Sequence, residues 1–183
     1  HPAALRQLRQ FADHVQPDQL YFQLLRTARY AKAFPERPKT LDYMDAFAAG
    51  MQRRAKNTKG PVRWIWQLEY QRLKQQEEAV FPWFDRHTVI TKQDQQLIHH
   101  PDNEQIKVIS NGIDLQYFQL PDPSPEKDVD ILFAGNMSYA PNVRAAQFIA
   151  EKVVPLLRPS FPKLRVALVG TDPHPQVKQL AGK

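Results

Sequence analysis

Short apolar runs alternate with amphipathic runs along this 183-residue chain, and this alternation limits the fold more than any other feature. Runs with the length and composition of strands cover residues 18–25, 38–44, 86–91 and 106–110. Helical patterns lie before and between them, over residues 2–14, 45–58, 61–84 and 92–100. Strands that alternate with helices form parallel sheets, so the pattern predicts an α/β unit.

A stretch with three prolines and no apolar period, 115–128, interrupts the alternation. We interpret it as an interdomain linker. The pattern then resumes, with strands predicted over 130–134 and 164–169 and helices over 141–158 and from residue 174. The sequence therefore predicts two α/β units with parallel sheets, 1–114 and 129–183. Both have fewer elements than a complete doubly wound domain.

The composition excludes several kinds of site. The chain has no cysteine, which excludes disulfides and thiolate–zinc sites. No apolar run approaches the length that spans a bilayer. Asp128-Val129-Asp130 has the D-x-D form of some metal sites but begins a strand, and His99-His100 lack further ligands at helical spacing, so we expect no metal site. The net charge of +6 indicates an anionic partner such as phosphate, nucleic acid or a lipid headgroup.

Residues 131–150, ILFAGNMSYAPNVRAAQFIA, predict a strand, a tight turn and a helix. Pro141 falls in the first turn of that helix, where a missing N–H costs nothing. Free N–H groups and the helix dipole there favour an anion, and Gly135 permits close backbone approach. An ordinary strand–helix turn is the alternative. The chain has no G-x-G-x-x-G and no Walker lysine, so neither classical dinucleotide binding nor a P-loop is indicated.

A basic span without acidic residues lies between Asp45 and Glu69. Its cations, flanked by Met51, Trp64 and Trp66, are Arg53, Arg54, Lys56, Lys59 and Arg63. Cations with aromatic residues suit an anionic membrane surface or a polyprenyl-diphosphate acceptor. The alternative, slightly favoured, is a solvated helix–turn–helix edge whose tryptophans point inward. No known nucleic-acid module accompanies the charge, so we expect no nucleic-acid partner.

Several segments together resemble glycosyltransferase family 4, and more narrowly the bacterial sugar transferases associated with exopolysaccharide systems. The first three are VISNGIDLQYF (108–118), ILFAGNMSYAPNVRAAQFIAEKVVPLLR (131–158) and PKLRVALVGTDPHPQVKQLA (162–181). Upstream, TLDYMDA (40–46) and QLEYQRLKQQEEAVFPWFDRHTVIT (67–91) resemble the acceptor-domain segment of the same group. The resemblance covers most of residues 38–181, and its specificity comes from the order of the segments.

The resemblance implies a GT-B fold, in which two Rossmann-like domains face each other across a cleft. The second domain would bind the diphosphate of a nucleotide sugar through Gly135, Asn136, Met137, Ser138, Asn142 and Gly170. Where family members carry an arginine and a lysine facing the diphosphate, this chain has Asn136 and Pro141-Asn142, whose amides can hydrogen-bond phosphate. The family's E-x7-E segment would follow Lys183. We therefore expect an internal fragment that is inactive alone.

Three carboxylates are candidate site residues in the first unit. Asp42 and Asp45 follow the strand at 38–44, where one of them could orient or deprotonate an acceptor hydroxyl. Alternatively they cap the next helix; both interpretations stay open for Asp42, and the cap is favoured for Asp45. Glu77 interrupts an apolar stripe on helix 61–84, and we expect it to be partly buried and paired with an arginine such as Arg86.

These observations lead to a functional expectation. The chain is expected to take part in transfer of a sugar from a nucleotide-sugar donor to a polysaccharide or lipid-linked acceptor, with no further cofactor. The resemblance implies retention of the anomeric configuration. Two alternatives are a non-catalytic binding or scaffold module and a peripheral membrane-binding fragment. We expect the chain to be located in the cytoplasm, with a position at the inner face of the membrane as an alternative.

Overall fold

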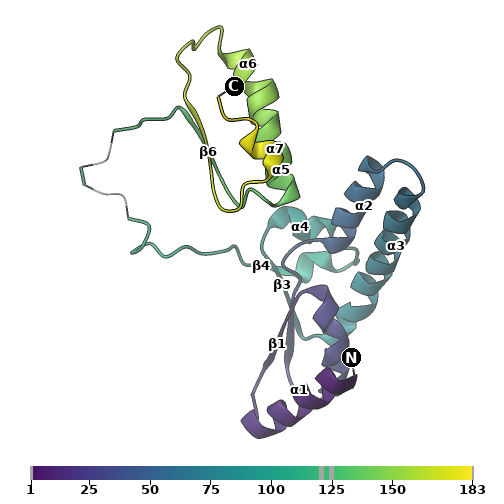
Figure 1. Cartoon of the computed structure of the whole chain (residues 1–183). Coiled ribbons are helices and arrows are strands. Elements are labelled where there is room, and N and C mark those ends of the chain that lie inside the picture. The colour runs from purple at the N-terminus through teal and green to yellow at the C-terminus, as the bar shows by residue number, and fades with distance from the viewer. Residues whose placement is uncertain (1, 120–121, 124–125, 183) are drawn as a thin grey trace. The chain divides into compact units, whose positions relative to one another are not determined.

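The computed structural model describes residues 2–119, 122–123 and 126–182. The chain divides into two compact units, residues 1–114 and 115–183, which are described separately below (Figure 1). The expected linker, 115–128, lies partly outside the described residues. Its described part contains no helix or strand.

Unit 1 contains a parallel four-stranded sheet in the order β1-β2-β3-β4. The strands are β1 (Leu20–Gln23), β2 (Lys39–Asp42), β3 (Arg86–Val89) and β4 (Lys107–Val108). Phe22, Leu41 and His87 share one register row and are all buried. The neighbouring row points to the opposite face, and there Tyr21 and Arg86 are exposed and Thr40 is half-buried. One face of the sheet therefore carries the core, while the other is open over this row.

Helices cover the core face of this sheet. They are α1 (Pro2–Val15), the 3-10 helix η1 (Leu25–Ala33), α2 (Phe47–Asn57), α3 (Val62–Val80), η2 (Phe81–Trp83), α4 (Lys92–Leu97) and η3 (Asn103–Gln105). α2 and α3 form a helical hairpin that turns at Gly60 (φ 75°), as Figure 1 shows. The core itself includes Leu25, Leu41, Val80, Val89, Ile98 and Ile106.

The predicted strands of unit 1 are confirmed in place and are shorter than expected. The helix predicted over 61–84 ends at Val80, and Phe84 is in extended conformation. No element was predicted between residues 26 and 37, where η1 lies. Leu25, Ala28 and Ala31 recur at every third residue and are all buried, which matches the three-residue turn of a 3-10 helix.

Unit 2 contains a parallel pair of strands, β5 (Ile131–Ala134) and β6 (Val166–Val169). Between them run α5 (Ala140–Phe148), a π-helical turn η4 (Ile149–Val153) and α6 (Val154–Leu157); α7 (Pro175–Lys178) follows β6. Pro155, the second residue of α6, has no N–H to donate to a carbonyl one turn earlier, and the π-helical turn η4 ends two residues before it. The core of this unit is formed by Met137, Val143, Ala146, Val177 and Leu180.

Both units are thus mixed α/β structures with parallel strands, as the alternation predicts. Within the described ranges, no helix combines the length and the apolar character needed to cross a membrane.

Candidate functional site

The turn between β5 and α5 is shaped by its own side chains. The Asn136 Oδ1 atom accepts hydrogen bonds from the N–H of Ser138 (2.9 Å) and from its Oγ (2.7 Å). The Asn142 Nδ2 atom donates to the carbonyl of Asn136 (2.9 Å). A Cβ at Gly135 would lie 2.8 Å from that same Nδ2 atom, so the turn has room only for glycine unless Asn142 moves.

The loops that follow β5 and β6 are joined at the carboxyl ends of the two strands. The N–H of Gly135 donates to Val169 O (2.9 Å), and that of Met137 donates to Thr171 O (2.9 Å). A Cβ at Gly170 would fall 1.6 Å from the carbonyl oxygen of Gly135, so only glycine permits this approach. The two predicted donor-binding glycines are therefore neighbours in space. The carboxyl end of a parallel sheet is also where α/β proteins bind ligands.

Few backbone donors of this turn remain for an anion. The N–H groups of Ser138, Tyr139, Asn142 and Val143 are bonded inside the turn. Among its described residues, the amides of Asn136 and Ala140 are left, and Ala140 is the first residue of α5. The Met137 side chain is buried in the core, and its backbone N–H and carbonyl are bonded to Thr171 and His174, so this predicted donor contact has no group free for a ligand.

In unit 1, Asp42 is buried and bonded at the carboxyl end of β2. Its Oδ2 atom accepts from the Tyr21 hydroxyl (2.7 Å), and its Oδ1 atom accepts from the N–H of Met44 (3.1 Å). The Tyr21 side chain is 63% exposed, and its partial burial and the Asp42 carboxylate raise its pKa. Asp42 therefore contacts an accessible hydroxyl on the open face of the sheet. Tyr21 is not among the predicted site residues; the signal for it in the sequence is strand alternation, since it directly precedes Phe22, which is buried.

Asp45 does not cap α2, and that prediction is wrong. The cap position of α2 is Ala46, which makes no side-chain cap bond. The first N–H groups are instead bonded by carboxylates from other helices: Asp94 Oδ1 accepts from Ala46 (3.3 Å), and Glu77 Oε1 accepts from Ala48 (3.1 Å). Asp45 itself is exposed. Desolvation, together with the charge of Asp94, raises the pKa of Asp45, and Arg53 opposes the shift.

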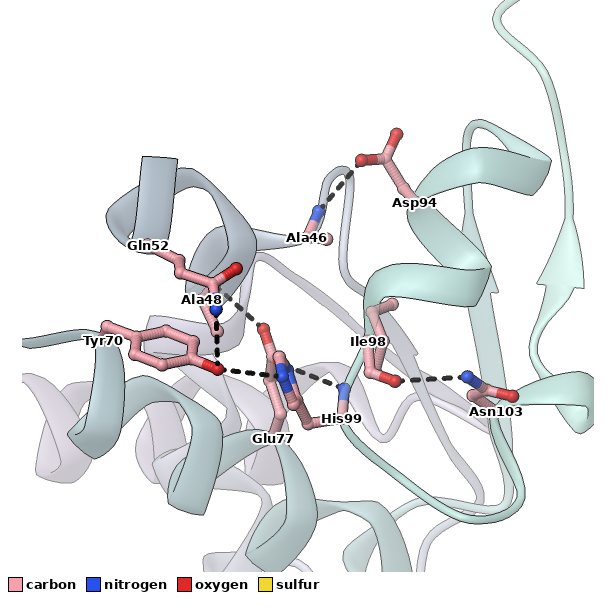
Figure 2. A network of polar contacts seen from close by, with 9 residues as sticks. All are labelled: Ala46, Ala48, Gln52, Tyr70, Glu77, Asp94, Ile98, His99 and Asn103. Atoms are coloured by element: carbon pink, nitrogen blue, oxygen red, sulfur yellow. Dashed lines mark hydrogen bonds and ion pairs between the residues drawn. The ribbon is translucent and has the colours of Figure 1, made fainter. Parts of the chain in front are cut away.

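Glu77 lies at the centre of a buried polar network (Figure 2). It is fully buried, and its Oε2 atom accepts from the backbone N–H of His99 (3.1 Å) and lies 3.2 Å from His99 Nδ1. His99 Nε2 is 3.3 Å from the hydroxyl of Tyr70, which accepts from Gln52 Nε2 (3.3 Å). Burial raises the pKa of Glu77, and the hydrogen bonds from His99 and Ala48 lower it.

This network corrects the prediction for Glu77. Its partner is His99 and not Arg86, which donates to Gln19 Oε1 (3.4 Å). A carboxylate at Nδ1 is the arrangement that makes an imidazole a base at Nε2. Here the Tyr70 hydroxyl lies at Nε2, so the network joins α2, α3 and the segment that follows α4 and has no base free for a substrate. An acid inside an apolar stripe signals a buried partner but does not identify it.

The basic span occupies the α2–α3 hairpin. Its cations Arg53, Arg54, Lys56, Lys59 and Arg63 are all exposed. The Arg54 guanidinium lies over the ring of Trp66, 4.7 Å from its centroid, and Trp66 is half-buried. Trp64, in contrast, is 72% exposed. The prediction that both tryptophans point inward is therefore wrong for Trp64.

The two motifs set aside as metal candidates form other contacts. Asp130 stands just before β5, and its Oδ2 atom accepts from the N–H of Arg165 (2.7 Å). His100 stacks on Phe81, with ring centroids 3.7 Å apart. In the part of the chain that the structure describes, no group of three or more acidic or histidine side chains could hold a metal ion.

Comparison of the chain with protein-family models and with curated proteins gives no match to either. Family membership therefore stays a proposal that rests on the resemblance of the segments quoted above.

Proposed function

We propose that this chain serves in the transfer of a sugar from a nucleotide-sugar donor to a polysaccharide or lipid-linked acceptor. In this proposal the two units correspond to the Rossmann-like domains of a GT-B enzyme. Unit 2 holds the donor and unit 1 the acceptor. The support is the resemblance to glycosyltransferase family 4 together with parallel α/β architecture in both units.

The observation that carries the donor side is the contact between Gly135 and Gly170 beyond the carboxyl ends of β5 and β6. Two loops that close on each other with no side chain between them leave backbone as the surface available to a ligand. α5 begins five residues after Gly135, so its positive end faces the same turn. A diphosphate suits such a surface, because it can accept from the Asn136 and Ala140 amides without needing a cation.

On the acceptor side, Asp42 is the better candidate of the two predicted carboxylates. It is held by two hydrogen bonds and shares one of them with the exposed Tyr21 hydroxyl. An acceptor hydroxyl that replaced Tyr21 would meet a fixed carboxylate oxygen. Asp45 is exposed, and its side chain is not used to cap α2, so it stays available as a second acceptor contact.

The donor proposal is tested by calorimetric titration of the chain with UDP, GDP and ADP, beside the variant Asn136→Asp. The substituted carboxylate keeps an oxygen for both bonds from Ser138 but adds a negative charge at the turn. At a separation of about 6 Å and an intermediate dielectric of about 40, repulsion by the new carboxylate weakens the binding free energy by roughly 1.4 kcal/mol for each phosphate charge. We expect one nucleoside diphosphate to bind and its affinity to fall at least tenfold in the variant. Equal affinity of both proteins would place the ligand elsewhere.

A non-catalytic binding module remains the second candidate, because Asn136 and Pro141-Asn142 stand where family members carry cations. A transfer and donor-hydrolysis assay with a radiolabelled sugar nucleotide separates the two. Binding without turnover is expected both of the binding module and of a transferase fragment that is inactive alone, so turnover is the result that discriminates. Turnover that Asp42→Asn abolishes would favour the transferase.

A further inference from the structure

The α3 helix carries apolar side chains on two opposite faces in its first half. Trp66, Tyr70 and Leu73 lie on the face toward α2, since Trp66 contacts Arg54 and Tyr70 bonds Gln52. Trp64, Ile65 and Leu68 are spaced to share the other face. They are 72%, 61% and 65% exposed, so the first half of α3 presents an apolar face that the described residues of its unit leave open.

Five exposed cations belong to the same helical hairpin as this apolar face. Between residues 46 and 68 the sequence has no acidic residue, and Arg53, Arg54, Lys56, Lys59 and Arg63 are all exposed on the same hairpin. Lys56 and Lys59 lie at the end of α2 and in the turn, and Arg63 is in the first turn of α3. We call Trp64, Ile65, Leu68 and these five cations the hairpin surface.

We propose that the hairpin surface docks on an anionic lipid bilayer. Tryptophan prefers the interface between headgroups and acyl chains, and transfer of the neighbouring aliphatic side chains from water into the bilayer is favourable in free energy. Cations at the same level meet anionic headgroups. The hairpin surface would act in this way whether or not unit 2 holds a nucleotide.

Charge argues against two other occupants. A second copy of the chain on this face would bring two sets of the same cations together, with no acidic residue between 46 and 68 to pair with them. Nucleic acid would satisfy the cations, but its binding is dominated by phosphate contacts and gains little from Ile65 and Leu68. A bilayer with anionic headgroups is complementary to both the charged and the apolar part.

The test is flotation of the whole chain with vesicles of phosphatidylcholine alone and with vesicles that contain phosphatidylglycerol. We expect binding to the anionic vesicles and much weaker binding to the neutral ones. Binding should fall with added salt, since the screening length shortens from about 10 Å at 0.1 M to about 3 Å at 1 M.

Two sets of variants separate the contributions. Replacing Lys56, Lys59 and Arg63 by glutamine should weaken binding roughly 100-fold, at about fivefold for each cation near the surface. The matched control replaces Lys152, Lys163 and Lys178, exposed in unit 2, and loses the same net charge. Replacing Trp64, Ile65 and Leu68 by glutamine should also abolish flotation, whereas Leu156→Gln with Phe161→Gln, equally exposed in unit 2, should not. All changed side chains are on the surface, and circular dichroism checks the fold.

Tryptophan fluorescence locates the contact. In the variant with Trp66→Phe and Trp83→Phe, Trp64 is the remaining tryptophan, and its emission should shift to the blue and be quenched by bromolipid in anionic vesicles. Equal binding to neutral vesicles, or equal loss in the hairpin and control variants, would overturn the proposal. Binding of DNA or RNA without vesicle binding, or a dimer that the Trp64, Ile65 and Leu68 changes dissociate, would overturn it as well.

Discussion

Protonation of His87 should destabilise unit 1 as the pH falls. His87 lies in β3, is 6% exposed and stacks on Phe81 with ring centroids 3.9 Å apart. His100 stacks on the same Phe81 ring at 3.7 Å, which places its charge near His87. Burial, and to a smaller extent His100, lower the pKa of His87 from 6.5 to about 4, although the carbonyls of Phe81 and Phe84 oppose the shift.

The direction and size follow from the two pKa values. Below pH 6.5 the unfolded chain binds a proton at His87 that the folded chain rejects, so the free energy of unfolding falls as the pH drops from about 6.5 to about 4. At about 1.4 kcal/mol for each pKa unit, the full loss is about 3 kcal/mol. The variant His87→Phe keeps an aromatic ring beside Phe81 and removes the titration.

The assay is urea unfolding at pH 7, 6, 5 and 4, followed by tryptophan fluorescence. Trp64, Trp66 and Trp83 all lie in unit 1, so the signal reports that unit alone. The difference in stability between wild type and His87→Phe should change by about 3 kcal/mol over this range. The exposed His14→Gln serves as a control and should keep the wild-type slope. A constant difference between wild type and His87→Phe would refute the reasoning.

Three further substitutions test the structure. Glu77→Ala should lower the unfolding free energy of unit 1 by about 2–6 kcal/mol, because the N–H groups of Ala48 and His99 lose their acceptor. The control Asp45→Asn, at an exposed position, should lower it by less than about 0.5 kcal/mol in the same urea titration. Gly50→Ala in α2, where nothing lies within 4 Å of the added Cβ, should raise that free energy by about 0.5–1 kcal/mol, and any loss would contradict the described helix. Gly170→Ala should lower the free energy of unfolding of unit 2 by about 3 kcal/mol or more, measured by amide hydrogen exchange, because its Cβ would overlap the carbonyl of Gly135.

The sequence was informative where a pattern has one physical interpretation. Alternating runs predicted the strands of both described sheets, because short apolar or β-branched segments of four to eight residues between helical patterns have few other uses in an α/β chain. It also brought Gly135 and Gly170 to the same sheet edge, since the carboxyl ends of parallel strands meet there. The structure adds that their loops touch, with Val169 and Thr171 as partners.

Long-range pairing explains what the sequence could not predict. Glu77 finds His99, 22 residues away, and α2 is capped by Glu77 and Asp94, which come from two other helices. Local spacing favoured Asp45 as the cap because only near neighbours are visible in a sequence. Trp64 and Trp66 differ by two positions, so one faces α2 and the other solvent, and composition alone cannot separate them.

The central claim is that the turn between β5 and α5 binds the diphosphate of a nucleotide sugar. Amide chemical shifts of the ¹⁵N-labelled chain, followed during titration with UDP, GDP and ADP and with the matching nucleosides, test it most directly. The account predicts saturable shifts at Gly135, Asn136, Ala140 and Gly170 with one diphosphate and none with its nucleoside. Unchanged amides at millimolar diphosphate, or shifts confined to unit 1, would contradict it.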